Sequence, residues 1–475
     1  MDRELGWVLA ALSAPMERAA LVCSSAQPSY LYQKTQAFLA LDTPEAGDLP
    51  FYADADACAG ACLQQPSMPQ QIPPVVAQAC AQVRTRSAFV PEDLTAGTVH
   101  ALYGKTLELS ASKIDRFASC RYAYFLQYGL RAKPWKQAEF DASLFGTFVH
   151  QVLQFTVNDV MAQGGFHAVS DEAVDAIAAR HMRAYLDNEL RHLAGQGRRE
   201  EYLSQRNLQE AAAIVRDVAN ELRCSDFRPI ETELAFDRSG QSLAPIEYRA
   251  SRGVGRLTGI VDRVDAYDTE HARYYRVVDY KTGKKDFDFS EILCGENLQM
   301  LLYLSALRQL KPSDDPRPFI PAGVLYVPGR YSMIQLDAGE DPAAARKERS
   351  KQLRRKGVIL RDEPVLGAME HFDDQPQYMP YTCKKNGPSG NLVNADQLAG
   401  LERFVNESVC AMIDELLSGA VRQNPIVRGA ASSACRFCDF RTACHKDAWK
   451  IAQRNRKRVS ADEFWRQIEG GRHDG

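Results

Sequence analysis

The 475-residue sequence contains no run of about 20 consecutive apolar residues, which a membrane-spanning helix would need. Its first residues, Met1-Asp2-Arg3-Glu4, lack the basic-then-apolar layout of a signal peptide. A large excess of charge is also missing, because the formal net charge is -3 at pH 7. Nucleic-acid binding is therefore not indicated by bulk composition, although charge can be segregated locally. These absences predict a cytoplasmic protein that makes no membrane contact.

A complete phosphate-binding loop is absent as well. Gly104-Lys105-Thr106 has the end of such a loop, but Val99 stands where the first glycine is required. We therefore expect no ATP hydrolysis by this chain. Basic residues do gather in two segments, 345–361 and 446–458, and such runs are most often solvated faces.

The length exceeds what one hydrophobic core usually supports, so two or three domains are expected. Apolar periodicity indicates helices in one part of the chain and β-branched runs indicate strands in another. The expected helices cover residues 29–41, 110–124, 144–161, 171–222 (with a break near 195), 298–310 and 397–417. The expected strands cover residues 16–24, 230–236, 246–250, 255–266, 274–280 and 323–327. This order favours an α/β or α+β fold with a mixed sheet flanked by helices.

Two of these strands carry the most informative residues. Asp262 lies on the first, and Asp279 and Lys281 lie two residues apart on the second. Alternate residues of a strand share a face, so a hairpin of normal register would bring the three side chains together. Two carboxylates suit Mg²⁺, and the lysine can orient a water or stabilise charge on a phosphate. Asp265 is three residues from Asp262 and is expected on the other face, towards solvent or a salt bridge.

Further residues are weaker candidates when taken alone. Glu231 and Glu233 share a strand face, and either could add a metal ligand. His150 lies on an expected helix, where a lone histidine is more often structural. Gln299 and Tyr303 are four apart on one helix face and could orient Lys281 or contact a phosphate, or simply pack.

The cysteines form a second constellation. Cys435 and Cys438 are followed closely by Cys444, which is a metal-like spacing. A fourth ligand is needed. His445 would complete a zinc site, whereas Cys120 would favour an iron–sulfur cluster, and the spacing leaves both open.

These motifs occur together, in a fixed order, in one known family. The stretches that carry the likeness are Ser110-Ala-Ser-Lys-Ile-Asp-Arg-Phe-Ala-Ser-Cys120, Gly146-Thr-Phe-Val-His150, Glu231-Thr-Glu233-Leu-Ala-Phe236, Gly259-Ile-Val-Asp262-Arg-Val-Asp265, Asp279-Tyr-Lys281 and Gln299 with Tyr303. The sequence resembles the RecB-like branch of the PD-(D/E)XK nuclease superfamily, and within it the nuclease domains of AddB-type helicase–nuclease proteins.

The resemblance assigns roles to the candidates. It implies a catalytic set of Lys281, Asp279, Asp262, Glu233, His150, Gln299 and Tyr303, in which His150, Asp262 and Asp279 bind Mg²⁺ or Mn²⁺. It also implies that Cys120, Cys435, Cys438 and Cys444 hold a 4Fe–4S cluster, in place of a zinc site completed by His445. Residues 106–450 would form the PD-(D/E)XK core, residues 1–105 the end of a helicase-like domain with a linker, and residues 451–475 a basic and polar tail.

The activity implied by the resemblance is metal-dependent cleavage of single-stranded DNA ends during double-strand-break repair by homologous recombination. A helicase–nuclease protein of AddA type would be the partner. The alternative is a non-catalytic DNA-binding or scaffolding module of such a complex. The intact Asp279-x-Lys281 pair tells against that alternative, because a purely structural role needs no lysine there.

Overall fold

The structure, a computed structural model, falls into two compact units, residues 1–89 and 90–475. The residues it describes are 74–87, 93–133, 142–189, 198–239, 243–283, 285–311, 315–330, 348, 350–429, 433–444 and 453–470. The expected strand at 16–24, the expected helix at 29–41 and most of the helicase-like remnant lie outside them. The described residues of the first unit form one helix, α4 (Pro74–Ser87). No described helix has the length and apolar character needed to cross a membrane.

A mixed sheet of six strands, in the order β11-β8-β7-β6-β5-β2, forms the centre of the second unit. β5 pairs antiparallel with both β2 and β6, whereas β6 and β7 run parallel. The strands are β2 (Arg228–Phe236), β5 (Gly259–Asp268), β6 (Arg273–Lys281), β7 (Phe319–Pro328), β8 (Lys356–Leu360) and β11 (Leu392–Val393). The expected mixed sheet flanked by helices is confirmed.

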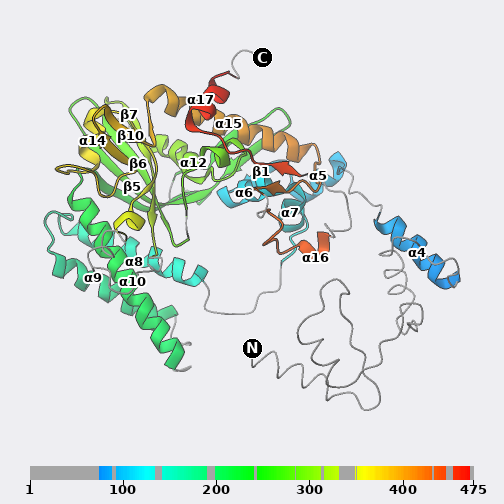
Figure 1. The fold of residues 1–475 in the computed structure, drawn as a ribbon, viewed down its shortest axis with the longest axis horizontal. Coiled ribbons are helices and arrows are strands. Elements are labelled where there is room, and N and C mark those ends of the chain that lie inside the picture. Colours follow the sequence, from blue (N-terminus) through cyan, green and yellow to red (C-terminus); the bar gives the residue numbers. More distant parts are fainter. Residues whose placement is uncertain are drawn as a thin grey trace. The chain divides into compact units, whose positions relative to one another are not determined.

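Helices cover both faces of this sheet (Figure 1). Side chains alternate along β7, so Val324 and Tyr326 join one hydrophobic core and Leu325 and Val327 join the other. The second core is closed by α8 (Ala142–Ala162), α9 (Asp171–Glu189) and α10 (Arg198–Arg223). The first is closed mainly by α6 (Ala111–Ser119), α11 (Phe289–Leu293), α12 (Gln299–Ala306), α15 (Ala395–Leu417) and α17 (Ala461–Gly470).

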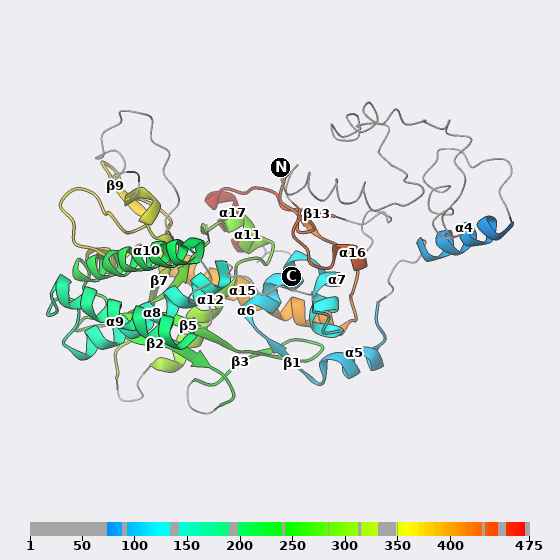
Figure 2. The same cartoon turned by 90° about the horizontal axis from the view of Figure 1, so that it is seen from below.

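The run 255–266, expected as one strand, is divided at Thr258. Its first part is β4 (Val254–Leu257), which pairs with β1 (Thr106–Leu109) and β3 (Ile246–Arg249) in a separate sheet of three strands (Figure 2). The Thr258 N–H donates to the carbonyl oxygen of Leu109, 3.1 Å away, so the backbone leaves one ladder before it enters the next. The break releases β5 into the central sheet.

The C-terminal region differs from the expected polar tail. Within residues 451–475, α17 buries Phe464 completely and Trp465 almost completely in the first core. Phe464 lies 4.7 Å from Phe289 between ring centroids. Because this region is basic and polar in composition, the sequence did not indicate its short amphipathic helix, which packs on α11 and α15.

Shorter elements complete the described fold. They are α5 (Ala96–Tyr103), α7 (Arg121–Tyr124), a π-helix (Phe125–Gly129), a 3-10 helix (Leu307–Leu310), α14 (Glu363–Met369), β9 (Tyr381–Lys384), β10 (Gly387–Gly390), β12 (Ile426–Val427), α16 (Arg441–Cys444) and β13 (Arg454–Asn455).

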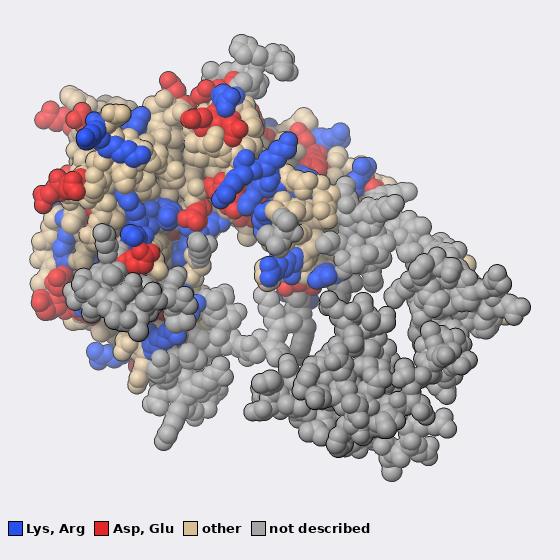
Figure 3. Space-filling model, in the orientation of Figure 1, with Lys and Arg blue, Asp and Glu red and all other residues tan. Residues whose placement is uncertain are grey.

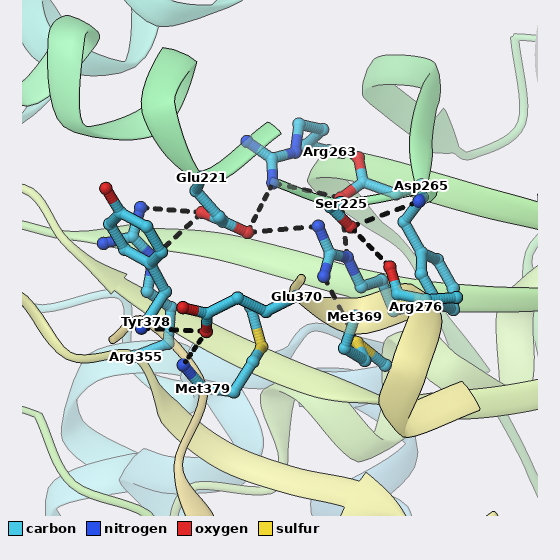
Figure 4. Close-up of polar contacts among 12 residues, drawn as sticks. Glu221, Ser225, Arg263, Asp265, Arg276, Arg355, Met369, Glu370, Tyr378 and Met379 are labelled. Atoms are coloured by element: carbon cyan, nitrogen blue, oxygen red, sulfur yellow. Dashed lines mark hydrogen bonds and ion pairs between the residues drawn. The ribbon is translucent and has the colours of Figure 1, made fainter. Parts of the chain in front are cut away.

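Between α10 and the sheet lies a buried network of formal charges, which we call the buried ion network (Figure 4). It balances three guanidinium groups against three carboxylates. Its members are Asp217 and Glu221 of α10, Arg263 and Asp265 of β5, Arg276 of β6, and Arg355 just before β8. Asp265, expected at solvent or in a salt bridge, is fully buried and accepts hydrogen bonds from two arginines.

Glu221 is the centre of this network. One carboxylate oxygen accepts from Arg276 at 3.1 Å, and the other accepts from Arg355 at 2.9 and 2.7 Å. Burial alone would raise the pKa of Glu221, but the neighbouring arginines outweigh it and hold that pKa at about 2. The carboxylate is therefore charged in the folded protein over the whole physiological pH range.

Replacing Glu221 with glutamine is expected to lower the free energy of unfolding by about 3–5 kcal/mol, because buried guanidinium groups would lose their counter-charge. Glu407→Gln, at an exposed position of α15, is the matched control. The folded pKa lies below the ordinary value of 4.5, so the stabilisation is present above that value and is lost as pH falls towards 2. Chemical denaturation of wild type and both variants, at neutral and at acidic pH, measures the free energy of unfolding. Equal denaturation midpoints at neutral pH would contradict it.

Candidate active centre and cysteine site

The β5–β6 hairpin brings the candidate acids together. Arg263 pairs with Val278 in its register, so the next pair towards the open end is Asp262 with Asp279. Asp262 Oδ2 accepts a hydrogen bond from the Tyr280 N–H at 2.7 Å, which fixes the carboxylate against β6. Both acids are buried, Asp279 to 1% exposure.

Asp279, Lys281, Gln299 and Tyr303 form one chain of polar contacts. Lys281 Nζ lies 2.6 Å from Asp279 Oδ2. The Gln299 side chain, at the start of α12, accepts from Lys281 at 3.3 Å and donates to Asp279 at 3.0 Å. Its amide also lies 3.2 Å from the Tyr303 hydroxyl, one helical turn later. Gln299 therefore holds both members of the Asp279–Lys281 pair.

His150, Glu233 and Asp262 make a second group, in which one ligand atom from each lies within 4.8 Å of the others. His150 comes from α8, where its Nδ1 is 3.3 Å from Asp262 Oδ2 and its Nε2 is 2.7 Å from the Tyr280 carbonyl oxygen. Glu233 occupies the β2 position opposite Asp262 in the β2–β5 register, with a φ of 47° that is unusual for glutamate. The neighbouring candidate Glu231 is exposed and is not part of this group.

The electrostatics of the two groups reflect crowded negative charge. Burial and the charge of Asp262 raise the pKa of Asp279 to about 6 and that of Glu233 to about 7. Burial opposes protonation of His150, but its hydrogen bond to Asp262 and the nearby carboxylates outweigh this and raise its pKa to about 9. Carboxylates that resist ionisation side by side are typical of a site that gains from a cation.

These residues fit a divalent metal. Oxygen donors from Asp262 and Glu233 with one imidazole are an acceptable ligand set for Mg²⁺ or Mn²⁺. Asp279 Oδ2 is buried and receives no hydrogen bond of good geometry, although Lys281 lies close to it. The compact group contains Glu233 and leaves out Asp279, whereas the resemblance assigned the metal to His150, Asp262 and Asp279.

The four cysteines also converge. Cys120 follows α6, and together with Cys435, Cys438 and Cys444 it lines one small cavity. None of the four forms a disulfide bond. Burial and the neighbouring cysteines raise the pKa of Cys444 to about 11. His445, the alternative ligand, lies outside the described residues.

The spacing of these sulfurs bears on which metal they fit. A single tetrahedral zinc ion would hold its sulfur ligands roughly 3.8 Å apart. Among the described residues, the group of three or more candidate ligands whose atoms lie within 4.8 Å of one another is His150, Glu233 and Asp262. Three of the cysteine sulfurs therefore do not come this close to one another. The sulfurs are thus more widely spaced than around a bound zinc ion, and four cysteines around one cavity are also the ligand set of an iron–sulfur cluster.

Polar contacts join the cysteine region to the active centre. Glu296 forms ion pairs with Arg428 and Arg456, which flank β12 and β13, and lies 3.5 Å from the Ser119 hydroxyl next to Cys120. Asp115 of α6 accepts from the N–H of Asn297 at 2.7 Å. Residues 296 and 297 lead directly into α12, so the cysteine region supports the helix that carries Gln299.

The basic segments contribute to packing at several positions. Arg355 belongs to the buried ion network, and Arg354 donates to the carbonyl oxygen of Met379 at 2.6 Å. Arg454 donates to backbone carbonyl oxygens and Arg456 pairs with Glu291. Figure 3 shows basic and acidic side chains interspersed on one face of the molecule. Charge counts along the sequence therefore overstate the basic surface in these segments.

Sequence reasoning missed the part played by Tyr280. The sequence assigned no role to this residue. In the structure its backbone N–H contacts Asp262 and its carbonyl oxygen contacts His150. One signal was available: Arg263, in an otherwise apolar strand, needs a buried counter-charge. That requirement points to a polar cluster behind the hairpin.

The fold agrees with the comparison to known families. Residues 108–445 match the model of the PD-(D/E)XK nuclease superfamily, and the chain belongs to this superfamily. Similar curated proteins are named as B-type subunits of ATP-dependent helicase/deoxyribonuclease. That of Acetivibrio thermocellus is 30% identical over 359 residues, which are 74% of this chain and 31% of that protein. That of Clostridium novyi is 28% identical over 364 residues, which are 75% of this chain and 32% of that protein. The chain spans about a third of the length of these relatives.

Proposed function

We propose that this chain is a divalent-metal-dependent nuclease that hydrolyses phosphodiester bonds in single-stranded DNA. The observation that carries the proposal is the placement of the His150–Glu233–Asp262 group beside the Asp279–Lys281 pair. His150, Glu233 and Asp262 would hold Mg²⁺ or Mn²⁺, with Asp279 on the adjacent strand as a further candidate ligand. Bound there, the metal would polarise the phosphodiester and acidify a water.

The chain's own residues have defined tasks in this proposal. Lys281, held by Asp279 and Gln299, orients the attacking water and stabilises the charge that grows on the phosphate. Tyr303 limits the freedom of Gln299 from one turn along α12. The contacts of Lys281 Nζ with Asp279 and Gln299 set its position, and an in-line attack requires a fixed geometry of this kind.

The biological role is proposed from the similar proteins. The name of these relatives joins helicase and deoxyribonuclease. We propose that this chain supplies the nuclease activity of such a complex in the cytoplasm, with an AddA-type partner that delivers single-stranded ends during double-strand-break repair by homologous recombination. We further propose that Cys120, Cys435, Cys438 and Cys444 hold a 4Fe–4S cluster, which is supported by the convergence of all four side chains on one cavity.

Cleavage of end-labelled DNA by the purified chain tests the activity. We expect degradation of single-stranded DNA with Mg²⁺ or Mn²⁺, little degradation of blunt duplex, and none in excess chelator. Asp262→Asn should reduce cleavage strongly, because it removes a charged ligand while keeping the side-chain shape. Glu407→Gln serves as the exposed control. DNA retention without cleavage under any divalent ion would favour the scaffolding alternative instead.

A further inference from the structure

The hairpin motif contains residues that the proposed chemistry leaves unused. Asp262 and Asp279 face the active centre, but Arg263, Asp265 and Arg276 face α10 on the other side of the sheet. All three of these residues are fully buried. Buried ion pairs contribute little net stability, because desolvation offsets much of their attraction. Stability alone is therefore a weak reason for placing them directly behind a metal site.

Tyr280 is in contact with both sides of the sheet. Its hydroxyl accepts a hydrogen bond from Arg263 Nη1 at 3.0 Å, inside the buried ion network. Its backbone N–H donates to Asp262 Oδ2 at 2.7 Å. Its carbonyl oxygen lies 2.7 Å from His150 Nε2, within hydrogen-bond distance. One residue thus joins two candidate metal ligands to the network.

The Arg263 guanidinium can hold the phenol because it is itself fixed. Its Nε and Nη2 donate to the two oxygens of Asp265 at 2.8 and 3.0 Å, which is a bidentate arrangement. Asp265 is shared with Arg276, and Arg276 donates to Glu221 of α10. The ring of Tyr280 is buried to 3% exposure, so its position is set on all sides.

The carbonyl of Tyr280 has a chemical task at His150. A histidine that ligates a metal through one nitrogen usually donates its other N–H to a fixed acceptor, which sets ring orientation and tautomer. With Nε2–H directed at the Tyr280 carbonyl, the Nδ1 side of the ring faces Asp262 Oδ2, 3.3 Å away. Nδ1 is therefore the nitrogen that would exchange its proton for a metal ion. A shift of this carbonyl would move the imidazole, and a shift of the adjoining N–H would move the Asp262 carboxylate.

We propose that Tyr280 and Arg263 are positioning residues for the metal ligands, and that the buried ion network sets the geometry of Asp262 and His150 through the Tyr280 backbone. The inference rests on the proposed function for the identity of the bound ion, but the positioning itself is a property of the metal-free protein. The proposal predicts that loss of the Tyr280 hydroxyl, on one face of the sheet, changes the positions of Asp262 and His150 at the active centre.

Tyr280→Phe in the full chain is the test, because it removes one oxygen and keeps the ring. Tyr378→Phe is the matched control. Tyr378 is also buried and packs against Arg355 of the same network, 4.8 Å from guanidinium carbon to ring centroid, and it has no contact with the active centre among the interactions of the described residues.

Two measurements separate the positioning from the chemistry. In metal-free protein with ¹⁵N-labelled histidine, the Nε2–H signal of His150 (assigned with His150→Gln) should be protected from solvent exchange in wild type and in Tyr378→Phe. It should exchange faster in Tyr280→Phe. By calorimetry, Tyr280→Phe should weaken Mn²⁺ binding by about tenfold, the lower end of what loss of an outer-shell partner costs, and Tyr378→Phe should not.

Unchanged Nε2–H exchange in Tyr280→Phe would overturn the inference and leave the nuclease proposal standing. Equal effects of the two phenylalanine variants would also overturn it, because a general loosening of the network would then suffice. If wild type binds no Mn²⁺ while Tyr280→Phe still alters Nε2–H exchange, the positioning stands and the proposed nuclease function fails.

Discussion

Replacing Lys281 with methionine is expected to reduce single-stranded DNA cleavage by about 10²- to 10³-fold, the usual effect of removing one group that stabilises charge in a transition state. Methionine keeps most of the length and apolar volume of the side chain, so the fold should persist. Lys281 approaches the centre from β6 with its Nζ held 2.6 Å from Asp279 Oδ2 and 3.3 Å from Gln299 Oε1. The effect should appear in kcat at saturating DNA.

The metal affinity of this variant is the informative companion measurement. Removing a cation beside buried carboxylates should leave Mn²⁺ binding unchanged or make it tighter. Lys385→Met, at an exposed position in the β9–β10 turn, is the control for surface charge. Wild-type cleavage by Lys281→Met would remove Lys281 from the mechanism. A parallel loss of Mn²⁺ binding would instead indicate that Lys281 supports the site structurally.

Replacing Cys120 with serine is the second change with a large expected effect. Wild type should be brown and contain iron and sulfide, and the variant should lose most of its cluster and unfold at a lower temperature. Cys120 lies about 300 residues before Cys435, and a cross-link that closes so long a loop is worth on the order of 5 kcal/mol in chain-entropy terms. Metal-site ligands of this kind act on folding rather than on chemistry.

Loss of the cluster should also lower activity at the active centre. Glu296 contacts Ser119 and pairs with Arg428 and Arg456, and it lies just before α12. Cluster loss should therefore reduce cleavage by disturbing Gln299, with Mn²⁺ affinity less affected. Cys410→Ser, a half-buried cysteine of α15 outside the cavity, is the control. A colourless wild-type protein with stoichiometric zinc after anaerobic preparation would refute the cluster.

The hairpin and its convergence were predictable because strand alternation and register are local rules. Asp262, Asp279 and Lys281 needed only the period of a strand and a short connection to be placed together. The helix that carries His150 was likewise evident from apolar spacing, and it is α8 in the structure. The sequence could not give the distance between α8 and β5, since that depends on how three helices pack on the sheet.

Other features depended on tertiary context. The φ of 47° at Glu233 has no signature in its neighbours, and it is sustained by the surrounding sheet. Gly259 looked like an ordinary motif glycine, but an added Cβ would meet Phe236 at 2.6 Å and Tyr303 at 2.9 Å. The helix α17 resembles a polar tail in sequence because charged and polar residues outnumber its two core aromatics, Phe464 and Trp465. In each case the deciding neighbour is distant in sequence.

The alternation of β5 separates two kinds of constraint within one short motif. Asp262 faces the active centre, whereas Arg263 and Asp265 face the buried ion network. In our proposal the acids are constrained by catalysis alone. The network residues are constrained both by positioning and by folding, because removing one partner of a buried ion pair destabilises the fold. A relative that had lost cleavage but kept its architecture should retain the second set while its acids and lysine drift. Comparing how often each of the two sets is substituted among related sequences would distinguish an inactive relative from an active nuclease without an assay.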